Sequence, residues 1–133
     1  MTEDQLEKKL RSHQLRPTQQ RMQLGGLLFL ESDRHITAEE LYTEAKSQNF
    51  SISLATVYNT LNQFSAVGLL KEVHIDRSRC YYDTNTTEHH HIFKASTGEI
   101  WDIPVDTINT QIDLEQIKHI GHVESVDIII RIS

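Results

Sequence analysis

The spacing of apolar residues divides the chain into a helical first part and a strand-rich second part. Up to residue 67, apolar side chains recur every three or four positions, which is the period of helices buried on one side. Four helices are predicted, over residues 2–13, 18–30, 37–47 and 54–67. Thr2 and Thr37 open capping-box sequences, and Ser53 is placed to cap the fourth helix. The face of that helix expected to be buried carries Leu54, Val57, Leu61 and Phe64.

From Gly68 onward the sequence favours strands. Two strands, at 69–75 and 80–84, flank Asp76-Arg77-Ser78-Arg79, which predicts a hairpin with two arginines at its turn. Helices followed by a basic hairpin are typical of a winged helix-turn-helix, in which the last helix enters the major groove of DNA. Arginines at the hairpin tip then reach phosphates or a minor groove. The alternative is a small helical bundle with an incidental hairpin.

The second part is too short to enclose much core. Strands are predicted at 89–95 and 99–103, a helix over 105–118, and a β-branched strand at 123–132. Because about 49 residues bury little apolar surface, we expect this part to dimerise. The predicted fold class is α+β, with an N-terminal winged helix-turn-helix (residues 1–84) followed by a small α/β dimerisation domain (85–133).

Charge separates the same two parts. The formal net charge is −6, yet residues 81–133 hold three Lys and Arg against nine Asp and Glu, while residues 1–80 hold ten of each. Residues 8–30 contain no carboxylate but include Arg11, Arg16 and Arg21. This pattern favours a polyanion-binding surface beside a cation site. No apolar run approaches the length of a membrane span and no leader sequence is present, so a cytoplasmic protein without membrane contact is expected.

Three consecutive histidines suggest metal binding. Side chains alternate faces along a strand, so His89 and His91 point together while His90 points away. Histidine is the commonest metal ligand, although a histidine-rich surface segment is the alternative. The single cysteine, Cys80, excludes an internal disulfide and any Cys-x-x-Cys zinc site within one chain.

Several motifs resemble one known family. Leu15-Arg16-Pro17-Thr18-Gln19-Gln20-Arg21, His35-Ile36-Thr37-Ala38-Glu39-Glu40-Leu41-Tyr42, Ser53-Leu54-Ala55-Thr56-Val57-Tyr58-Asn59-Thr60-Leu61 and the His triplet resemble the ferric uptake regulator family, in order. Within that family the chain looks most like the haem-responsive iron response regulator branch. The resemblance implies a regulatory metal site at His35, Asp83, His89, His91 and Asp102. Such a mixed N/O set suits Fe²⁺ or Mn²⁺ in the cell, with Zn²⁺ as an alternative in vitro.

Departures from the family pattern limit the resemblance. Lys94-Ala95-Ser96-Thr97 replaces the family's cysteine pair, so no cysteine-bound structural zinc is expected. The family's second site would fall at Glu88, His90, Asn109 and Asp127, where Asn109 is a poor ligand. The haem branch's N-terminal Cys-Pro motif is missing, so haem, if it binds, is expected at His90 or its neighbours.

The resemblance therefore implies a homodimeric transcriptional regulator, not an enzyme, that acts as a repressor in iron and haem metabolism. Its expected partner is AT-rich, palindromic operator DNA. The residues expected to contact DNA are Arg16, Thr18, Arg21, Ser53, Thr56, Tyr58, Asn59, Arg77 and Arg79. Alternatives are a peroxide-, manganese- or zinc-responsive member of the family, a small metalloenzyme, or a metal-buffering protein. The enzyme alternative lacks a poised nucleophile or a glycine-rich substrate loop.

Overall fold

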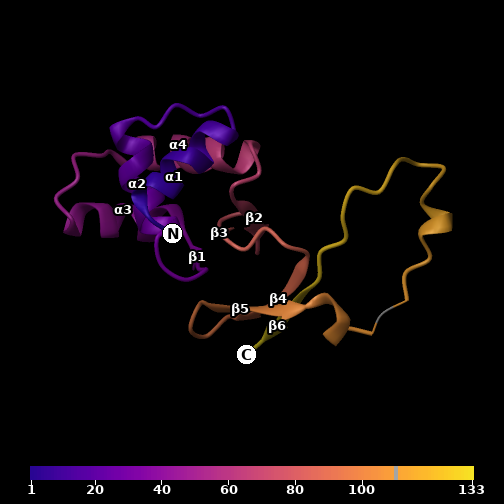
Figure 1. The fold of residues 1–133 in the computed structure, drawn as a ribbon. Coiled ribbons are helices and arrows are strands. Elements are labelled where there is room, and N and C mark those ends of the chain that lie inside the picture. Colours follow the sequence, from indigo (N-terminus) through magenta and orange to yellow (C-terminus); the bar gives the residue numbers. More distant parts are fainter. Residues whose placement is uncertain (110) are drawn as a thin grey trace. The chain divides into compact units, whose positions relative to one another are not determined.

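The computed structural model describes residues 1–109 and 111–133. The chain folds as two compact units, Met1–Thr86 and Thr87–Ser133, and each is described by itself (Figure 1). The helices and strands form the α+β fold predicted from the sequence, with a winged helix-turn-helix in the first unit. Within the described residues, no helix has both the length and the apolar character that a membrane span requires.

Four helices and a small sheet build the first unit. The helices are α1 (Glu3–Ser12), α2 (Gln19–Phe29), α3 (Ala38–Ser47) and α4 (Leu54–Ala66). Thr2, Thr18, Thr37 and Ser53 cap them, each side chain accepting a hydrogen bond from the backbone N–H three residues later. Gly68, with φ +84°, follows α4 and lets the chain turn there. The caps predicted at Thr2, Thr37 and Ser53 are therefore confirmed, and Thr18 is a further cap.

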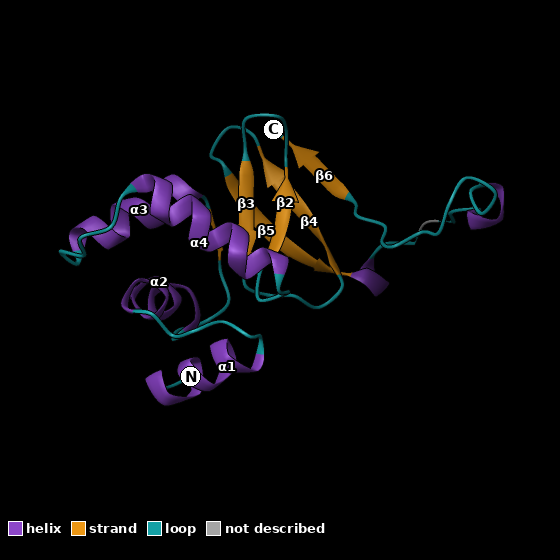
Figure 2. Ribbon diagram, turned by 90° about the horizontal axis from the view of Figure 1, so that it is seen from above, coloured by secondary structure: helices purple, strands orange, loops and turns teal. Residues whose placement is uncertain are grey.

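The core of the first unit lies among these helices. α3 packs against α2 and α4, and α1 packs against α2 (Figure 2). Phe29 and Phe64 contact each other with ring centroids 5.9 Å apart. Gly25 lies under Leu6, whose two methyl carbons would stand 3.2 Å from an added Cβ, so glycine allows α1 and α2 to approach closely.

The predicted burial of Leu54 is wrong. Leu54 is 37% exposed, whereas Val57, Leu61 and Phe64 are fully buried. Leu54 is the first residue of α4, directly after its cap, and the buried face of the helix begins one turn later. The helical period is correct, but it does not tell where along the helix packing starts.

The sheet of the first unit has the strand order β1-β3-β2, with β1 (His35–Ile36), β2 (Lys71–His74) and β3 (Cys80–Asp83) all antiparallel. β2 and β3 form the predicted hairpin after α4, the wing. Asp76 closes its turn by accepting hydrogen bonds from the Ser78 hydroxyl and from the N–H groups of Ser78 and Arg79. These bonds hold the pKa of the Asp76 carboxyl below its usual value.

The second unit is a three-stranded sheet with the order β5-β4-β6. β4 (His89–Lys94) pairs antiparallel with β5 (Glu99–Pro104) and parallel with β6 (Ile129–Ile132). Phe93 and Ile103 are buried in this unit. After β5 the chain leaves the sheet before returning as β6 (Figure 1).

The predicted helix over 105–118 is wrong. Its place is taken by two single-turn 3₁₀ helices, η1 (Val105–Thr107) and η2 (Leu114–Gln116), while residue 110 lies outside the described residues. The segment is rich in β-branched residues and in Asn and Asp, which lower helix propensity. The predicted strand over 123–132 is likewise shorter, because only Ile129–Ile132 pairs with β4.

Candidate metal centre and DNA-binding surface

The first ligand group lies in the first unit, where His35 of β1 stands directly across from Asp83 of β3. His35 Nε2 lies 3.0 Å from Asp83 Oδ2, and the other oxygen, Oδ1, accepts the Asn85 N–H at 2.9 Å. The Asp83 side chain is completely buried, and His35 is 14% exposed. A buried carboxylate is costly unless a cation or hydrogen-bond donors compensate its charge. This pair is therefore suited to face a positive ion.

Residues next to His35 anchor its strand to β3. The Arg34 N–H donates to the Thr84 hydroxyl at 2.8 Å, and the Thr84 N–H donates to the Arg34 carbonyl at 3.1 Å. The Arg34 guanidinium bonds both carboxylate oxygens of Glu44 on α3, and this pairing raises the Arg34 pKa. The pairing of Arg34 with Glu44 could not be predicted from the sequence, because only the tertiary fold brings the two residues together.

The second ligand group lies in the second unit and combines His89, His91 and Asp102. The β4–β5 register places Asp102 directly beside His91. Asp102 Oδ1 lies 3.1 Å from His89 Nε2 and 3.5 Å from His91 Nε2. Both imidazoles are buried, with ring centroids 4.5 Å apart, whereas the Asp102 side chain is 32% exposed. Strand alternation thus brings the two outer histidines of the triplet to one face, as the sequence predicts.

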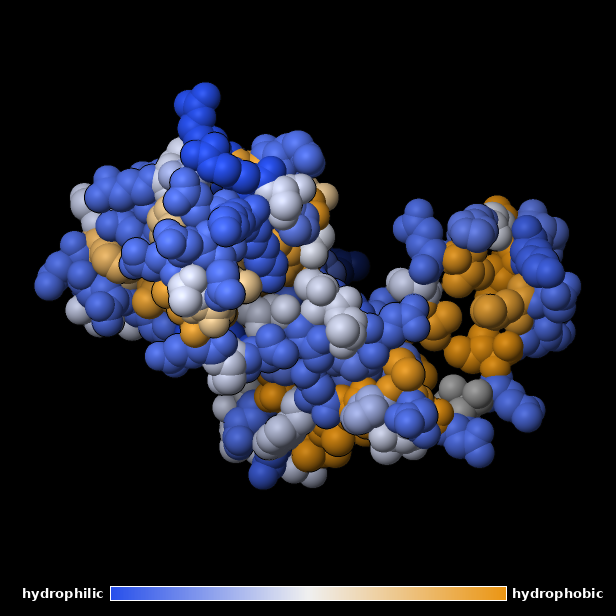
Figure 3. Space-filling model, viewed as in Figure 1, coloured by the Kyte–Doolittle hydropathy of each residue, from blue (hydrophilic) through white to orange (hydrophobic). Residues whose placement is uncertain are grey.

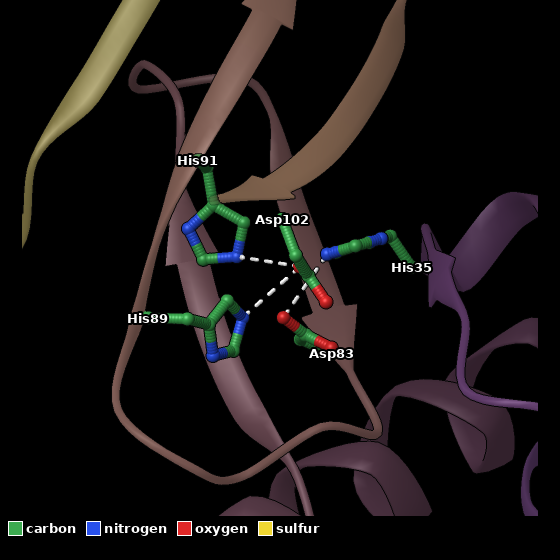
Figure 4. A group of neighbouring side chains, drawn as sticks. All are labelled: His35, Asp83, His89, His91 and Asp102. Atoms are coloured by element: carbon green, nitrogen blue, oxygen red, sulfur yellow. Dashed lines mark ion pairs between the residues drawn. The ribbon is translucent and has the colours of Figure 1, made fainter. Parts of the chain in front are cut away.

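A hydrogen bond fixes which nitrogen of His89 is available to a ligand. Its Nδ1 lies 2.6 Å from the Thr87 carbonyl oxygen, which can only accept. Nδ1 therefore carries a proton, and Nε2, on the side of Asp102, is the nitrogen that a cation could reach. Metal-ligating histidines usually have such a partner on the other nitrogen. Figure 4 draws both ligand groups and marks the ion pairs within each.

His90 makes a different contact. Its Nδ1 accepts the backbone N–H of Ile128 at 3.1 Å, just before β6. A neutral imidazole that accepts at Nδ1 carries its proton on Nε2, so neither nitrogen offers a lone pair to an ion. Asp127 accepts a hydrogen bond from Ser125, and among the described side chains Glu88, His90 and Asp127 form no common ligand group. The structure thus gives no geometric support for the second metal or haem site predicted there.

The candidate DNA-reading residues lie along α4. Ser53 and Thr56 form its first turn, where the Ser53 hydroxyl donates to that of Thr56 at 3.0 Å. Tyr58 and Asn59 are exposed one turn later. The Tyr58 hydroxyl donates to a carboxylate oxygen of Glu39 on α3, and this bond raises the Tyr58 pKa. These side chains present an uncharged surface of hydroxyl and amide groups, which can form hydrogen bonds to base edges in a major groove.

The predicted basic residues differ in their surroundings. Arg16 is exposed, and Thr18 caps α2. Arg21 donates to the Arg16 carbonyl at 2.9 Å and to the Gln63 side chain of α4 at 3.2 Å, so it also joins two elements of the first unit.

At the tip of the wing, Arg77 and Arg79 are exposed, and Arg79 Nε pairs with Asp76 at 3.2 Å. Arg79 therefore carries less uncompensated positive charge than the sequence alone indicates.

Fold and side chains together define a winged-helix protein that carries two groups of residues able to bind a metal ion. Residues 12–131 match the ferric uptake regulator family. A peroxide-responsive repressor, PerR, of Staphylococcus aureus is 38% identical over 101 residues, which are 75% of this chain and 67% of the relative. This chain belongs to the ferric uptake regulator family.

Solved structures of ferric uptake regulators share the fold. The crystal structure of the Vibrio cholerae protein has a TM-score of 0.73 at 24% identity, covering 94% of this chain and 96% of that one. The Pseudomonas aeruginosa protein with manganese has a TM-score of 0.70 at 23% identity, covering 99% and 97%.

Proposed function

We propose that this protein is a dimeric transcriptional regulator of iron metabolism whose affinity for operator DNA is set by a divalent metal ion. The observation that carries the proposal is the arrangement of the ligand groups. Asp83 is a fully buried carboxylate whose side-chain partner is His35, and His89 and His91 share one face with Asp102. Family membership supports a role in regulation, and manganese is bound by the Pseudomonas aeruginosa relative.

The chemistry of the groups favours a single ion held by both. Two ligands from the first unit cannot hold an ion alone, and three from the second would leave half of an octahedral Mn²⁺ or Fe²⁺ sphere to be filled. Together they offer three imidazoles and two carboxylates, a mixed N/O set for Fe²⁺, Mn²⁺ or Zn²⁺ in which the carboxylates neutralise the charge of the ion. An ion bound this way would join the two units, and so fix the spacing of two recognition helices α4 in a dimer.

Exposed apolar side chains support dimerisation through the second unit. Those with more than a third of their surface exposed are Trp101, Val105, Ile112, Leu114, Ile117, Ile120, Val126, Ile130 and Ile132. Figure 3 shows apolar residues over the segment that follows β5. Apolar surface on this scale in a unit of 47 residues favours burial against a second copy. DNA would then meet two copies of α4 and of the wing, as a palindromic operator requires.

A second candidate function is peroxide sensing. The observation in its favour is the 38% identity to a peroxide-responsive repressor. The two functions differ in their response to peroxide, because a peroxide sensor with bound iron should lose DNA affinity when peroxide is added, whereas a regulator of iron metabolism should not. Haem control is not part of the proposal, since His90 Nδ1 accepts the Ile128 N–H and Nε2 then carries the ring proton.

The deciding experiment measures operator binding with and without Mn²⁺. We compare the wild type, a His89→Ala/His91→Ala variant and a His119→Ala/His122→Ala control, whose histidines are exposed. Mn²⁺ should tighten binding of the wild type and the control but not of the first variant. Affinity that ignores the metal in every protein, or a first variant that responds like the control, refutes metal control by these histidines.

A further inference from the structure

Three other metal-ligating side chains share one face of the wing. Glu72 and His74 are two residues apart on β2, so they point to the same side of the strand. Cys80 of β3 is the register partner of His74 and points to that side as well. One potential ligand atom of each residue lies within 4.8 Å of those of the other two. His74 Nε2 and Glu72 Oε2 are 3.0 Å apart.

The cluster is accessible from solvent. The His74 side chain is 66% exposed and that of Glu72 34%. Cys80 is half-buried, and its face of the hairpin lines a recess of about 390 Å³. Across the recess lie Tyr58 and Glu39, which join the wing residues in lining it. A ligand can therefore approach the three side chains, and the recess leaves room for water beside His74 and Cys80.

We propose that Glu72, His74 and Cys80 form a zinc site on the wing. Zn²⁺ would be bound by the Cys80 thiolate, the His74 imidazole Nε2 and a Glu72 carboxylate oxygen, with water from the recess in the fourth position. Binding converts the Cys80 thiol to a thiolate, and its proton is released to solvent. The site lies wholly within the first unit and shares no residue with the ligand groups of the proposed function, so it stands independently of that function.

The separations suit tetrahedral zinc. Zinc–ligand bonds of about 2.0–2.3 Å at tetrahedral angles place the ligand atoms roughly 3.3–3.6 Å apart. The nitrogen and oxygen are now 3.0 Å apart and all three atoms lie within 4.8 Å, so rotations of side chains on a fixed hairpin can reach that geometry.

Sulfur also sets the choice of metal. A thiolate favours Zn²⁺ over Mn²⁺ or Fe²⁺, whereas the ligand group of His89, His91 and Asp102 has only nitrogen and oxygen. Burial and the nearby Glu72 charge raise the pKa of the Cys80 thiol, so protons should compete with the metal and binding should strengthen as pH rises.

Cobalt provides a direct test in the full chain. A thiolate bound to Co²⁺ gives a near-ultraviolet charge-transfer band, and the only thiol in the sequence is Cys80. The experiment uses the His89→Ala/His91→Ala background, which removes two of the three imidazoles of the proposed metal centre. We expect the band to saturate at one Co²⁺ per chain and to disappear on adding one equivalent of Zn²⁺.

Two surface variants distinguish a three-residue site from a single reactive thiol. In the same background, His74→Ala and Glu72→Gln should each weaken Zn²⁺ binding at least about tenfold, because loss of even an outer-shell partner of a metal ligand has an effect of that size. The control is His13→Ala, which removes a histidine of the first unit outside the cluster. Far-ultraviolet circular dichroism checks that all variants are folded.

No thiolate band in the parent background would overturn the proposal. So would a band that His74→Ala and Glu72→Gln leave unchanged, since that would show cobalt held by the thiol alone. A band whose absorbance per chain rises with protein concentration would also overturn it, because the ion would then be bridging Cys80 residues of two chains.

Discussion

The ion pair between Arg34 and Glu44 should stabilise the first unit by a measurable amount. The Arg34 guanidinium makes three hydrogen bonds, two to the Glu44 carboxylate and one to the Leu27 carbonyl in the last turn of α2 at 3.1 Å. The two side chains are 32% and 37% exposed, so the pair is partly screened. We take about 1–1.5 kcal/mol for the two bonds to Glu44 and about 1 kcal/mol for the bond to Leu27. Arg34→Ala should therefore lower the free energy of unfolding by about 2–2.5 kcal/mol.

A double-mutant cycle in urea tests this reasoning. Glu44→Ala should cost about 1–1.5 kcal/mol, less than Arg34→Ala because the bond to Leu27 remains. The coupling energy between the two residues should be about 1 kcal/mol. A coupling near zero, or equal costs for the two single variants, would refute this division of the energy. The backbone bonds between Arg34 and Thr84 survive the substitution, so the folded variant should keep its metal response.

Three further predictions concern α4 and the wing. Ser53→Ala removes the acceptor for the Thr56 N–H and should cost about 1 kcal/mol of unfolding free energy in urea; no change would mean that the cap is dispensable. Arg77→Ala should reduce the slope of log affinity for operator DNA against log salt by about one unit in fluorescence anisotropy, and an unchanged slope would exclude a phosphate contact. Because burial and Glu72 raise the Cys80 pKa, the thiolate should form only above the ordinary cysteine range of about 8.5. Iodoacetamide alkylation should follow that higher pH, and Glu72→Gln should move the profile downward; a midpoint at or below the ordinary value would contradict this.

Features that depend on a few neighbouring residues were predictable from the sequence. The caps at Thr2, Thr37 and Ser53 form because a hydroxyl meets an N–H three residues away, whatever the remaining fold. His89 and His91 share a face because strands alternate, and a strand of six residues is enough to fix that. Such signals need no knowledge of the partner element.

Features that depend on a partner element were not predictable. Nothing in the neighbourhood of Arg34 indicates Glu44, and the exposure of Leu54 depends on where along α4 the packing begins. The isoleucines of residues 105–118 have helical spacing, which predicts a helix. The β-branched, Asn and Asp residues of the same segment disfavour one, and the structure has two short 3₁₀ helices there instead. Helical spacing of apolar residues favours a helix only when another element packs against its apolar face. Without such packing, the low helix propensity of the other residues decides the conformation.

Register also explains why the sequence does not reveal the cluster on the wing. Glu72 and His74 are close in sequence, but Cys80 joins them only because the hairpin turn pairs it with His74. A turn one residue longer would place Cys80 on the other face of the wing. When the register is unknown, a single cysteine in a strand is most simply interpreted as a small buried apolar residue.

The histidine triplet divides its members between two tasks, and alternation is the reason. The outer two point to the face that carries Asp102, where His89 Nε2 is left as a ligand by the bond of Nδ1 to the Thr87 carbonyl. The middle one, His90, points to the opposite face and holds the start of β6 through the Ile128 N–H. A metal bound by the outer pair therefore acts on the same strand that positions β6, and β6 carries exposed isoleucines of the proposed dimer surface. Replacing His90 should consequently weaken the dimer and leave Mn²⁺ binding intact, whereas replacing His91 should weaken Mn²⁺ binding and affect the dimer only through loss of the metal. Analytical ultracentrifugation with and without Mn²⁺ checks both, and a His90 variant that dimerises like the wild type would contradict the reasoning.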